Sequence, residues 1–318
     1  KFHPKNKAYK DQYKFVSYYQ ASIANHGPTL HNEIFEPFFR KMTNRSSKSM
    51  LALYSRVAWL PLYYPETIYK LVNDENIEIQ STNFHYPKNQ FIGELAKTLY
   101  ENSIKNGVKH FNQKIKSLKK INDGIITFDD KFSIKGKDIV YSNQLIKLLN
   151  ESEIKANASI FDFDAWSVKV LFTTIKKDAL LKKFSCIYLP ENSSLPYRIR
   201  LQPNLSTENK DKIKLIFEFN PDYLSNIGYI DIDQILIKIY KDLVLCRILK
   251  DGFVLNLEKE IELQKCITFP DLENINKIKL QEEYAKNNYP HVKFPSLEGF
   301  FSDTLNDQII KGIIIGDN

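Results

Sequence analysis

The C-terminal stretch 294–316 reads FPSLEGFFSDTLNDQIIKGIIIG, and the interpretation of the chain starts from it. An apolar run is interrupted by Gly299, and a helical pattern begins after Thr304, a fair N-cap residue. Asp307, three residues later, gives a near capping box. The apolar face of this predicted helix contains Leu305, Ile309, Gly312, Ile313 and Gly316. The start of such a helix can hold a phosphate or a ring edge, and the alternative is a structural helix packed on a sheet.

Length and composition bound the class of protein. The chain has 318 residues, which predicts about two domains, and its 43% apolar and 26% charged residues are typical of a globular protein. The net charge is +7, but the basic residues are scattered, and the densest run, 114–120, alternates with apolar residues. We therefore expect no nucleic-acid partner. A modest positive field suits a small anionic substrate such as a nucleotide sugar.

The cysteines and the hydropathy predict a cytoplasmic protein. Cys186, Cys246 and Cys266 are odd in number and widely spaced, which favours reduced thiols over disulfides or a metal site. No apolar run approaches the roughly 18 residues of a transmembrane helix, and no signal peptide is visible. The chain begins at Lys1, so we expect the true N-terminus to lie upstream.

Residues 1–85 are predicted to be helical. A helix through Phe15–Ile23 is expected to stop at 25–28 (NHGP), a second covers 30–39 with a bend at Pro37, and a third follows a Ser46 or Ser47 cap as far as Val57. The next stretch, 56–66, contains two prolines and many aromatic rings. It predicts either a pocket or a loop pinned to the core by its rings. The candidate pocket residues are Arg56, Trp59, Tyr63 and Tyr64.

Residues 86–150 are predicted to form one helix, several short strands and the start of a second helix. An amphipathic helix is predicted over 90–106, with Leu95, Leu99 and Ile104 on one side and a stop at Gly107. The turn 122–124 (NDG) is a strong hairpin signal. Short strands are expected at 108–111, 115–118, 125–128, 132–134 and 138–142, followed by a helix from Gln144.

Residues 151–270 are predicted to form a sheet backed by one helix. Strands are expected at 160–163, 167–173, 186–189, 197–202, 212–219, 253–255 and 260–268. The intervening helix should begin at the N-cap Asp231 and present one apolar stripe as far as Leu243. Asp162 and Asp164 are interpreted as the polar face of the first strand, and a polar helix is expected at 277–287.

No standard catalytic motif is present in the sequence. It contains no nucleophile elbow, P-loop, HExxH or GxGxxG, and no acid–base pair can be proposed. His26 and His31, five residues apart, are interpreted as structural or surface residues. We assign no catalytic residue.

The strand 197–202 (YRIRLQ) is the most suggestive polar segment. Tyr197 shares one face with Ile199 and Leu201, whereas Arg198 and Arg200 share the other face. Two arginines on one face of a strand can hold a diphosphate or a carboxylate in bidentate fashion. The alternative is a simple solvent-exposed sheet face.

Several segments together resemble the superfamily of flavin amine oxidases, protoporphyrinogen oxidases and UDP-galactopyranose mutases. The order of 91–99 (FIGELAKTL), 106–108 (NGV), Ile115 and 138–142 (DIVYS) resembles the helix, strand, meander and returning strand of its FAD domain. The stretch 56–66 resembles its "R…PLYYPE" region, and 197–204 its "YR…SN" strand. The stretches 268–270 (TFP) and 294–312 resemble its closing segment. The sequence departs from the pattern because GxGxxG is absent and because Phe300 stands where mutases often have Arg.

The resemblance implies an α/β (α+β) fold, in which part of a FAD-binding Rossmann-like domain is interleaved with a helix-plus-antiparallel-sheet substrate domain. Residues 1–85 and 151–287 would form the substrate domain, and 86–150 and 288–318 the FAD domain. The implied FAD-binding residues are Gly299, Asn306, Asp307, Gln308 and Gly312. The implied substrate-binding residues are Arg56, Trp59, Tyr63, Tyr64, Tyr197, Arg198 and Arg200.

Two functions follow as hypotheses. The first is a FAD-dependent oxidoreductase or a flavin-assisted mutase that acts on a small or sugar-nucleotide substrate. The second is a binding protein that keeps the fold without a complete FAD site, which the missing fingerprint favours. About 40–80 residues upstream of Lys1 that contain a strand and GxGxxG would favour the first hypothesis. A nucleic-acid-binding role is a weaker third hypothesis, and its signature would be a steep salt dependence.

Overall fold

The structure of the chain is a computed structural model. It describes residues 15–55, 60, 62–63, 65–73, 93–112, 117–121, 124–129, 132–136, 139–142, 144–182, 184–201, 211–229, 231–295, 312–314 and 316. The chain divides into two compact units, which are described separately. The first unit comprises Lys1–Lys109 with Ala165–Ile267, and the second His110–Asp164 with Thr268–Asn318. The chain combines helices with antiparallel and parallel sheets, and its fold class is therefore α+β.

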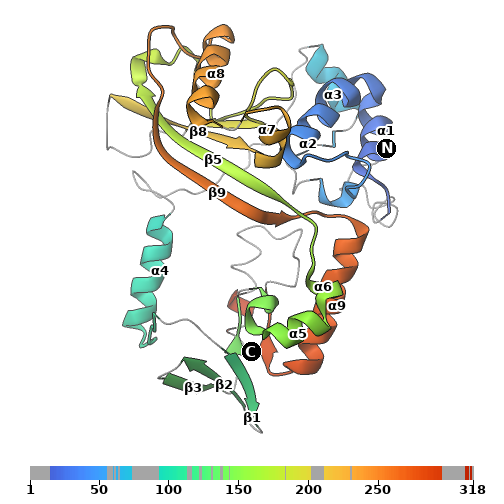
Figure 1. The fold of residues 1–318 in the computed structure, drawn as a ribbon, viewed down its shortest axis with the longest axis vertical. Helices are drawn as coiled ribbons and strands as arrows, with labels where there is room; N and C mark the ends of the chain where they lie inside the picture. The colour runs from blue at the N-terminus through green and yellow to red at the C-terminus, as the bar shows by residue number, and fades with distance from the viewer. Residues whose placement is uncertain are drawn as a thin grey trace. The chain divides into compact units, whose positions relative to one another are not determined.

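A five-stranded sheet dominates the first unit (Figure 1), in the order β6-β7-β8-β5-β9. Its strands are β5 (Ala165–Lys176), β6 (Cys186–Tyr188), β7 (Arg198–Leu201), β8 (Lys212–Phe219) and β9 (Asn256–Thr268). The β6–β7, β7–β8 and β8–β5 pairs are antiparallel. All five strands coincide with predicted ones. No strand forms at 253–255, where the structure describes irregular backbone.

Helix α8 (Ile232–Leu245) covers one face of this sheet (Figure 1), as predicted. The side chain of its N-cap Asp231 accepts a hydrogen bond from the backbone of Gln234. Alternate residues of β8 are fully buried in the shared core, and Phe217 and Phe219 are among them. Burial of each such ring contributes about 1.5–3 kcal/mol. The core fixes one face of β8 inward, so the remaining β8 side chains occupy the opposite face.

The N-terminal helices also belong to the first unit. They are α1 (Tyr18–Leu30), the π-helical turn η3 (His31–Phe35), α2 (Glu36–Thr43), α3 (Pro65–Val72) and α4 (Gly93–Lys105). The predicted stop at 25–28 is a kink inside α1, because Gly27 has a φ of 80° and Pro28 follows it. The chain continues through η3 into α2, with Pro37 in the first turn of α2.

The predicted third helix from Ser46 to Val57 is wrong over the described residues. Only one 3-10 turn forms there, η4 (Ala52–Tyr54). Ser46 and Ser49 hydrogen-bond within a turn, and Leu51 pairs with Ser17 in an isolated β-bridge. These local serine bonds compete with helix formation.

Helix α4 confirms the predicted helix and its stop, since Gly107 has a φ of 84° just after its end. No side chain of α4 is buried, and Leu99 is 59% exposed.

The second unit contains a small meander and a pair of parallel strands. The meander is β1 (Ser117–Ile121), β2 (Gly124–Asp129) and β3 (Phe132–Gly136), and it confirms the hairpin predicted at 122–124. Strand β4 (Ile139–Val140) pairs in parallel with β10 (Val292–Lys293). The helices are η5 (Leu145–Leu148), α5 (Glu151–Ala156), α6 (Ala158–Phe161) and α9 (Leu272–Asn288). Their core includes Leu145, Phe161 and Tyr289.

Two strand predictions fail near the second unit. Residues 108–111 are irregular, and 160–163 contain the end of α6 where a strand was expected. An Asn150 capping box starts α5, and α6 follows it directly. Long-range bonds fix the end of α6, since Lys277 donates to the carbonyl of Asp162 and Gln281 to that of Ile160. Asp162 therefore belongs to a helix C-terminus.

Candidate functional site

The candidate site lies on the face of the five-stranded sheet opposite α8. Ile199 is fully buried in the core on the α8 side, which places Arg198 and Arg200 of β7 on the other face. In the sheet register, Arg198 lies directly opposite Glu218 of β8 and Tyr188 of β6. The structure therefore brings together Arg198 and Arg200, as predicted, and adds a carboxylate between them.

Glu218 is the centre of this cluster. One of its oxygens, Oε2, accepts hydrogen bonds from the guanidinium of Arg198 and from the hydroxyl of Tyr197, the latter at 3.2 Å. The other oxygen, Oε1, lies 3.4 Å from Nε of Arg200. The side chains of Arg198 and Glu218 are 7% and 10% exposed, whereas that of Arg200 is 44% exposed. The cluster thus combines a buried ion pair with a half-exposed cation.

The electrostatics of the cluster favour the charged form of Arg198. Burial lowers the pKa of Arg198, but the hydrogen bond and the charge of Glu218 outweigh burial and raise that pKa overall. Burial raises the pKa of Tyr197, and the negative charge of Glu218 raises it further. The Tyr197 phenol is therefore a hydrogen-bond donor at neutral pH. Burial also raises the pKa of Tyr188, which hydrogen-bonds Arg198.

A buried lysine, missed at the sequence level, supports the loop between β6 and β7. Nζ of Lys41 on α2 donates to the carbonyls of Leu189, at 2.8 Å, and of Glu191, and to Oγ of Ser194 at 2.9 Å. Burial lowers the pKa of Lys41 to about 8, so the ammonium persists at neutral pH and its three donors match three acceptors. Its sequence context, a polar position of an amphipathic helix, gave no signal of this role.

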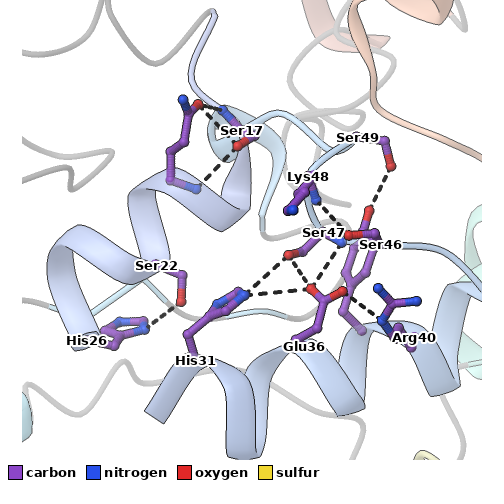
Figure 2. A network of polar contacts seen from close by, with 12 residues as sticks. Ser17, Ser22, His26, His31, Glu36, Arg40, Ser46, Ser47, Lys48 and Ser49 are labelled. Atoms are coloured by element: carbon purple, nitrogen blue, oxygen red, sulfur yellow. Dashed lines mark hydrogen bonds and ion pairs between the residues drawn. The ribbon is translucent and has the colours of Figure 1, made fainter. Parts of the chain in front are cut away.

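The predicted aromatic stretch 56–66 is described only in part. Tyr63 is 40% exposed, and its backbone N–H donates to Nε2 of His26 at 2.9 Å. Since Nε2 accepts, Nδ1 carries the proton of the neutral ring and faces Oγ of Ser22 at 3.1 Å (Figure 2). Burial lowers the pKa of His26 to about 4. Arg56, Trp59 and Tyr64 lie outside the described residues.

A second polar cluster contains a serine, a histidine and a glutamate (Figure 2). Ser47 donates through both its hydroxyl and its backbone N–H to Glu36, and Nε2 of His31 lies 3.5 Å from Oγ of Ser47 and 3.6 Å from Oε2 of Glu36. Arg40 pairs with the other oxygen of Glu36 at 2.8 Å. Burial opposes ionisation of Glu36, but hydrogen bonds from His31, Ser47 and Ser46 prevail and lower its pKa to about 2.

This second cluster has the residue types of a hydrolase triad without its geometry. In a triad the histidine accepts the serine proton, whereas here the hydroxyl of Ser47 donates directly to the carboxylate of Glu36. Ser47 and His31 are fully buried, so no substrate can reach the hydroxyl. The cluster ties the Ser46–Ser49 turn to η3 and α2, which makes its role structural.

The predicted FAD-binding residues fall mostly outside the described part of the chain. Gly299, Asn306, Asp307 and Gln308 are not described. Gly312 lies in a helical segment, is exposed, and would accommodate a Cβ without contact within 4 Å. Gly312 therefore permits close approach of a ligand without requiring one. Within the described ranges, no cluster of three metal-ligating side chains occurs, and no helix has the length and hydropathy to cross a membrane.

Known proteins resemble this chain in structure but not in sequence. No family model matches the chain, and no curated protein matches it by sequence. Reduced UDP-galactopyranose mutase is similar in structure, with a TM-score of 0.68 at 13% identity over 87% of this chain and 60% of the mutase. Putrescine oxidase bound to putrescine gives a TM-score of 0.53 at 10% identity over 94% of this chain and 67% of the oxidase. An oxidoreductase from Methanosarcina mazei gives 0.51 at 10% identity over 82% and 60%.

These likenesses confirm the predicted resemblance at the level of the fold. The chain has a fold found in UDP-galactopyranose mutase and in putrescine oxidase, two proteins of the superfamily named from the sequence. It spans about 60% of the length of the mutase.

Proposed function

We propose that this chain is the greater part of a flavoprotein that acts on a small anionic substrate, and that the sheet face bearing Arg200 contacts that substrate. The observation that supports the proposal is the joint occurrence of the mutase-like fold and a half-exposed arginine beside a buried ion pair on one sheet face. A nucleotide sugar, as in the name of the structurally similar mutase, is the substrate class that fits a guanidinium best.

In this proposal, FAD carries out the chemical step, and the protein binds the substrate and the cofactor. FAD, when bound, would supply redox or flavin-assisted isomerisation chemistry. The closing segment 294–316 would contribute to its site through Gly299, the helix start 306–308 and Gly312. Tyr63, Tyr197, Arg198 and Arg200 would form or support the substrate site, together with Arg56, Trp59 and Tyr64.

The proposed domain assignment follows from the same resemblance. Residues 86–150 and 288–318 would belong to the FAD domain, and 1–85 and 151–287 to the substrate domain. Limited proteolysis with and without FAD tests the assignment, because bound FAD should slow cleavage within the first two ranges more than within the others. Equal cleavage everywhere would contradict it.

The decisive test of function is an absorbance spectrum of the purified protein. A yellow protein with flavin bands that releases FAD on denaturation is the expected result. A colourless protein that gains no flavin bands on addition of FAD would overturn the flavoprotein proposal. In that case, retained binding of UDP would identify a cofactor-less binding protein with the same fold.

Two activity assays separate the enzyme classes. Chromatography of UDP-galactopyranose after incubation with the reduced protein detects an isomerised product and would favour a mutase. Oxygen consumption with putrescine and other amines would favour an oxidase. We expect the former, because a guanidinium on the sheet face attracts an anion and repels a protonated amine.

A further inference from the structure

One end of the first unit carries an excess of positive charge, and we call it the basic end. It consists of residues 176–182, 211–212 and 238–254, which include the end of β5, the start of β8 and the second half of α8 with the loop that follows it. Eight cations in these ranges stand against four aspartates, so the net charge is +4. Within the described part of the chain, only one of the eight is in an ion pair, which joins Lys238 to Asp242.

Backbone hydrogen bonds hold the three segments of the basic end side by side. The N–H of Leu181 donates to the carbonyl of Ile248 at 2.9 Å, and the N–H of Lys250 donates to the carbonyl of Ala179 at 2.8 Å. The last residues of β5 pair with the first residues of β8. Because like charges placed together repel one another, this concentration of cations does not stabilise the fold, and it suits a negatively charged partner.

The basic end also exposes aliphatic side chains. Leu245, Val254 and Leu181 are 83%, 71% and 50% exposed. A nucleic acid presents mainly phosphates to such a surface and gives aliphatic side chains little to contact. A bilayer with anionic lipids accepts both kinds of side chain, since cations lie at its phosphates and aliphatic groups enter the boundary below the headgroups. The combination therefore favours a lipid surface over a nucleic acid.

Arg247 occupies a backbone position that favours glycine. It follows the last turn of α8 with a φ of 54°, and its N–H donates to the carbonyl of Val244 at 2.9 Å. The next N–H, that of Ile248, donates to the carbonyl of Leu243. This is the Schellman arrangement, in which the left-handed residue is usually Gly. Attraction of a cation to the helix C-terminus offsets only part of the strain, so Arg247 places a charge two residues from Leu245 although it lowers local stability.

We propose that the basic end is a docking surface for a membrane that contains anionic lipids. Leu181, Leu245 and Val254 enter the headgroup level, and the cations around them, Arg247 and Lys250 among them, contact the lipid phosphates. This surface goes beyond the proposed flavin chemistry and does not depend on it. It lies at the opposite end of β8 from Glu218, since the six residues from 212 to 218 of that strand span about 20 Å.

Cosedimentation with vesicles tests the docking surface. The wild-type protein should pellet with phosphatidylcholine vesicles that contain about one-third phosphatidylserine, and it should stay in solution with pure phosphatidylcholine vesicles. Binding should weaken as salt is added, because mobile ions screen the attraction. Equal binding to both kinds of vesicle, or binding to neither, would overturn the proposal.

Two substitutions separate the apolar from the electrostatic contribution. Leu245→Ser should weaken binding to the anionic vesicles by about tenfold. Lys250→Ala should weaken it by about fivefold, the usual contribution of one cation near an anionic bilayer. Leu99→Ser and Lys105→Ala are the matched controls, because both side chains are exposed on α4 of the same unit, and we expect changes below about twofold. Losses as large in the controls would overturn the assignment to the basic end.

Arg247→Gly gives the sharpest test, because its expected effects on stability and on binding have opposite signs. Glycine adopts the left-handed conformation without strain, so the variant should unfold at a higher urea concentration than the wild type. It should nevertheless bind the anionic vesicles about fivefold more weakly. Unchanged vesicle binding by this variant would contradict the role of Arg247.

Other occupants of the basic end give different results. Binding of a DNA duplex under conditions in which no vesicles bind would assign the surface to a nucleic acid. A dimer in analytical ultracentrifugation that Leu245→Ser dissociates would assign it to a second copy of the chain. Either result overturns the proposal. The flavin spectrum is a separate readout, so loss of the docking surface leaves the flavoprotein in place, and a colourless protein that binds anionic vesicles keeps the docking surface.

Discussion

The two polar clusters of the first unit contain similar chemistry but differ in access to solvent. The cluster of His31, Glu36 and Ser47 has the residue types of a hydrolytic site, yet its serine and histidine are fully buried. The cluster around Glu218 looks like an ordinary ion-pair network, yet it keeps one cation 44% exposed. Exposure of a single polar member, more than the types of residue present, is what makes the cluster around Glu218 the candidate site.

The largest expected effect is on the buried ion pair of the cluster around Glu218. Arg198→Ala removes the buried partner of Glu218 and leaves this largely buried carboxylate beside Tyr197 and the half-exposed Arg200. We expect a loss of about 3–5 kcal/mol in the free energy of unfolding, measured by urea denaturation. A loss below about 1 kcal/mol would mean that Arg198 is as accessible as Arg200, and the distinction between them would fail.

The next effect is on stability at low pH, and it concerns the cluster of His31, Glu36 and Ser47. The pKa of Glu36 is lowered from 4.5 to about 2, so its contribution to stability is present above pH 4.5 and is lost as the pH falls toward 2. We expect a loss of about 2 kcal/mol across this window, after allowance for solvent screening.

The control for Glu36 is Glu36→Gln, which keeps the shape of the side chain but cannot ionise. Denaturation curves of this variant should lose that part of the acid dependence. A variant as acid-sensitive as the wild type between pH 4.5 and 2 would place the acid response elsewhere.

The pKa of His26 predicts a separate dependence of stability on pH, in a less acidic range than that of Glu36. Burial lowers its pKa from 6.5 to about 4, so the unfolded chain binds more protons between these values and stability falls as the pH drops from 6.5 to 4. We expect a change of about 2 kcal/mol over this window. His26→Gln keeps an acceptor for the backbone N–H of Tyr63 and cannot titrate, so its stability should lose this part of the pH dependence. An unchanged slope would contradict the buried neutral ring.

The smallest expected effect on stability is that of Arg200→Ala. Its contact with Glu218 is long and half-exposed, so we expect a change within about 1 kcal/mol in the free energy of unfolding. The same substitution should nevertheless weaken UDP binding most. A stability loss as large as that of Arg198→Ala would assign Arg200 to the structural support and leave the sheet face without a ligand contact.

The sequence could predict those features of the fold that depend on neighbouring residues alone. The alternation in 197–202 predicts both arginines on one face, and the pattern after Asp231 predicts its N-cap role. The structure confirms that role, since the side chain of Asp231 accepts a hydrogen bond from the backbone of Gln234. The turn 122–124 likewise predicted a hairpin from its own residues.

The partners of these residues could not be predicted, because they depend on strand register and tertiary packing. Glu218 is 20 residues from Arg198, and it lies opposite it only through the pairing of β7 with β8. Lys41 meets Ser194 across 153 residues. The strand predicted at 160–163 was wrong because α6 is fixed by Lys277 and Gln281, more than 110 residues away.

The division of roles between the two arginines can be measured directly on the wild-type protein. Modification by phenylglyoxal, followed residue by residue with mass spectrometry, reports the access of each guanidinium to solvent. Rapid modification of Arg200, slow modification of Arg198, and protection of Arg200 alone by UDP are the predicted results. Equal rates at both arginines, or a rate at Arg200 that UDP does not change, would contradict the assignment of this sheet face to an anionic substrate.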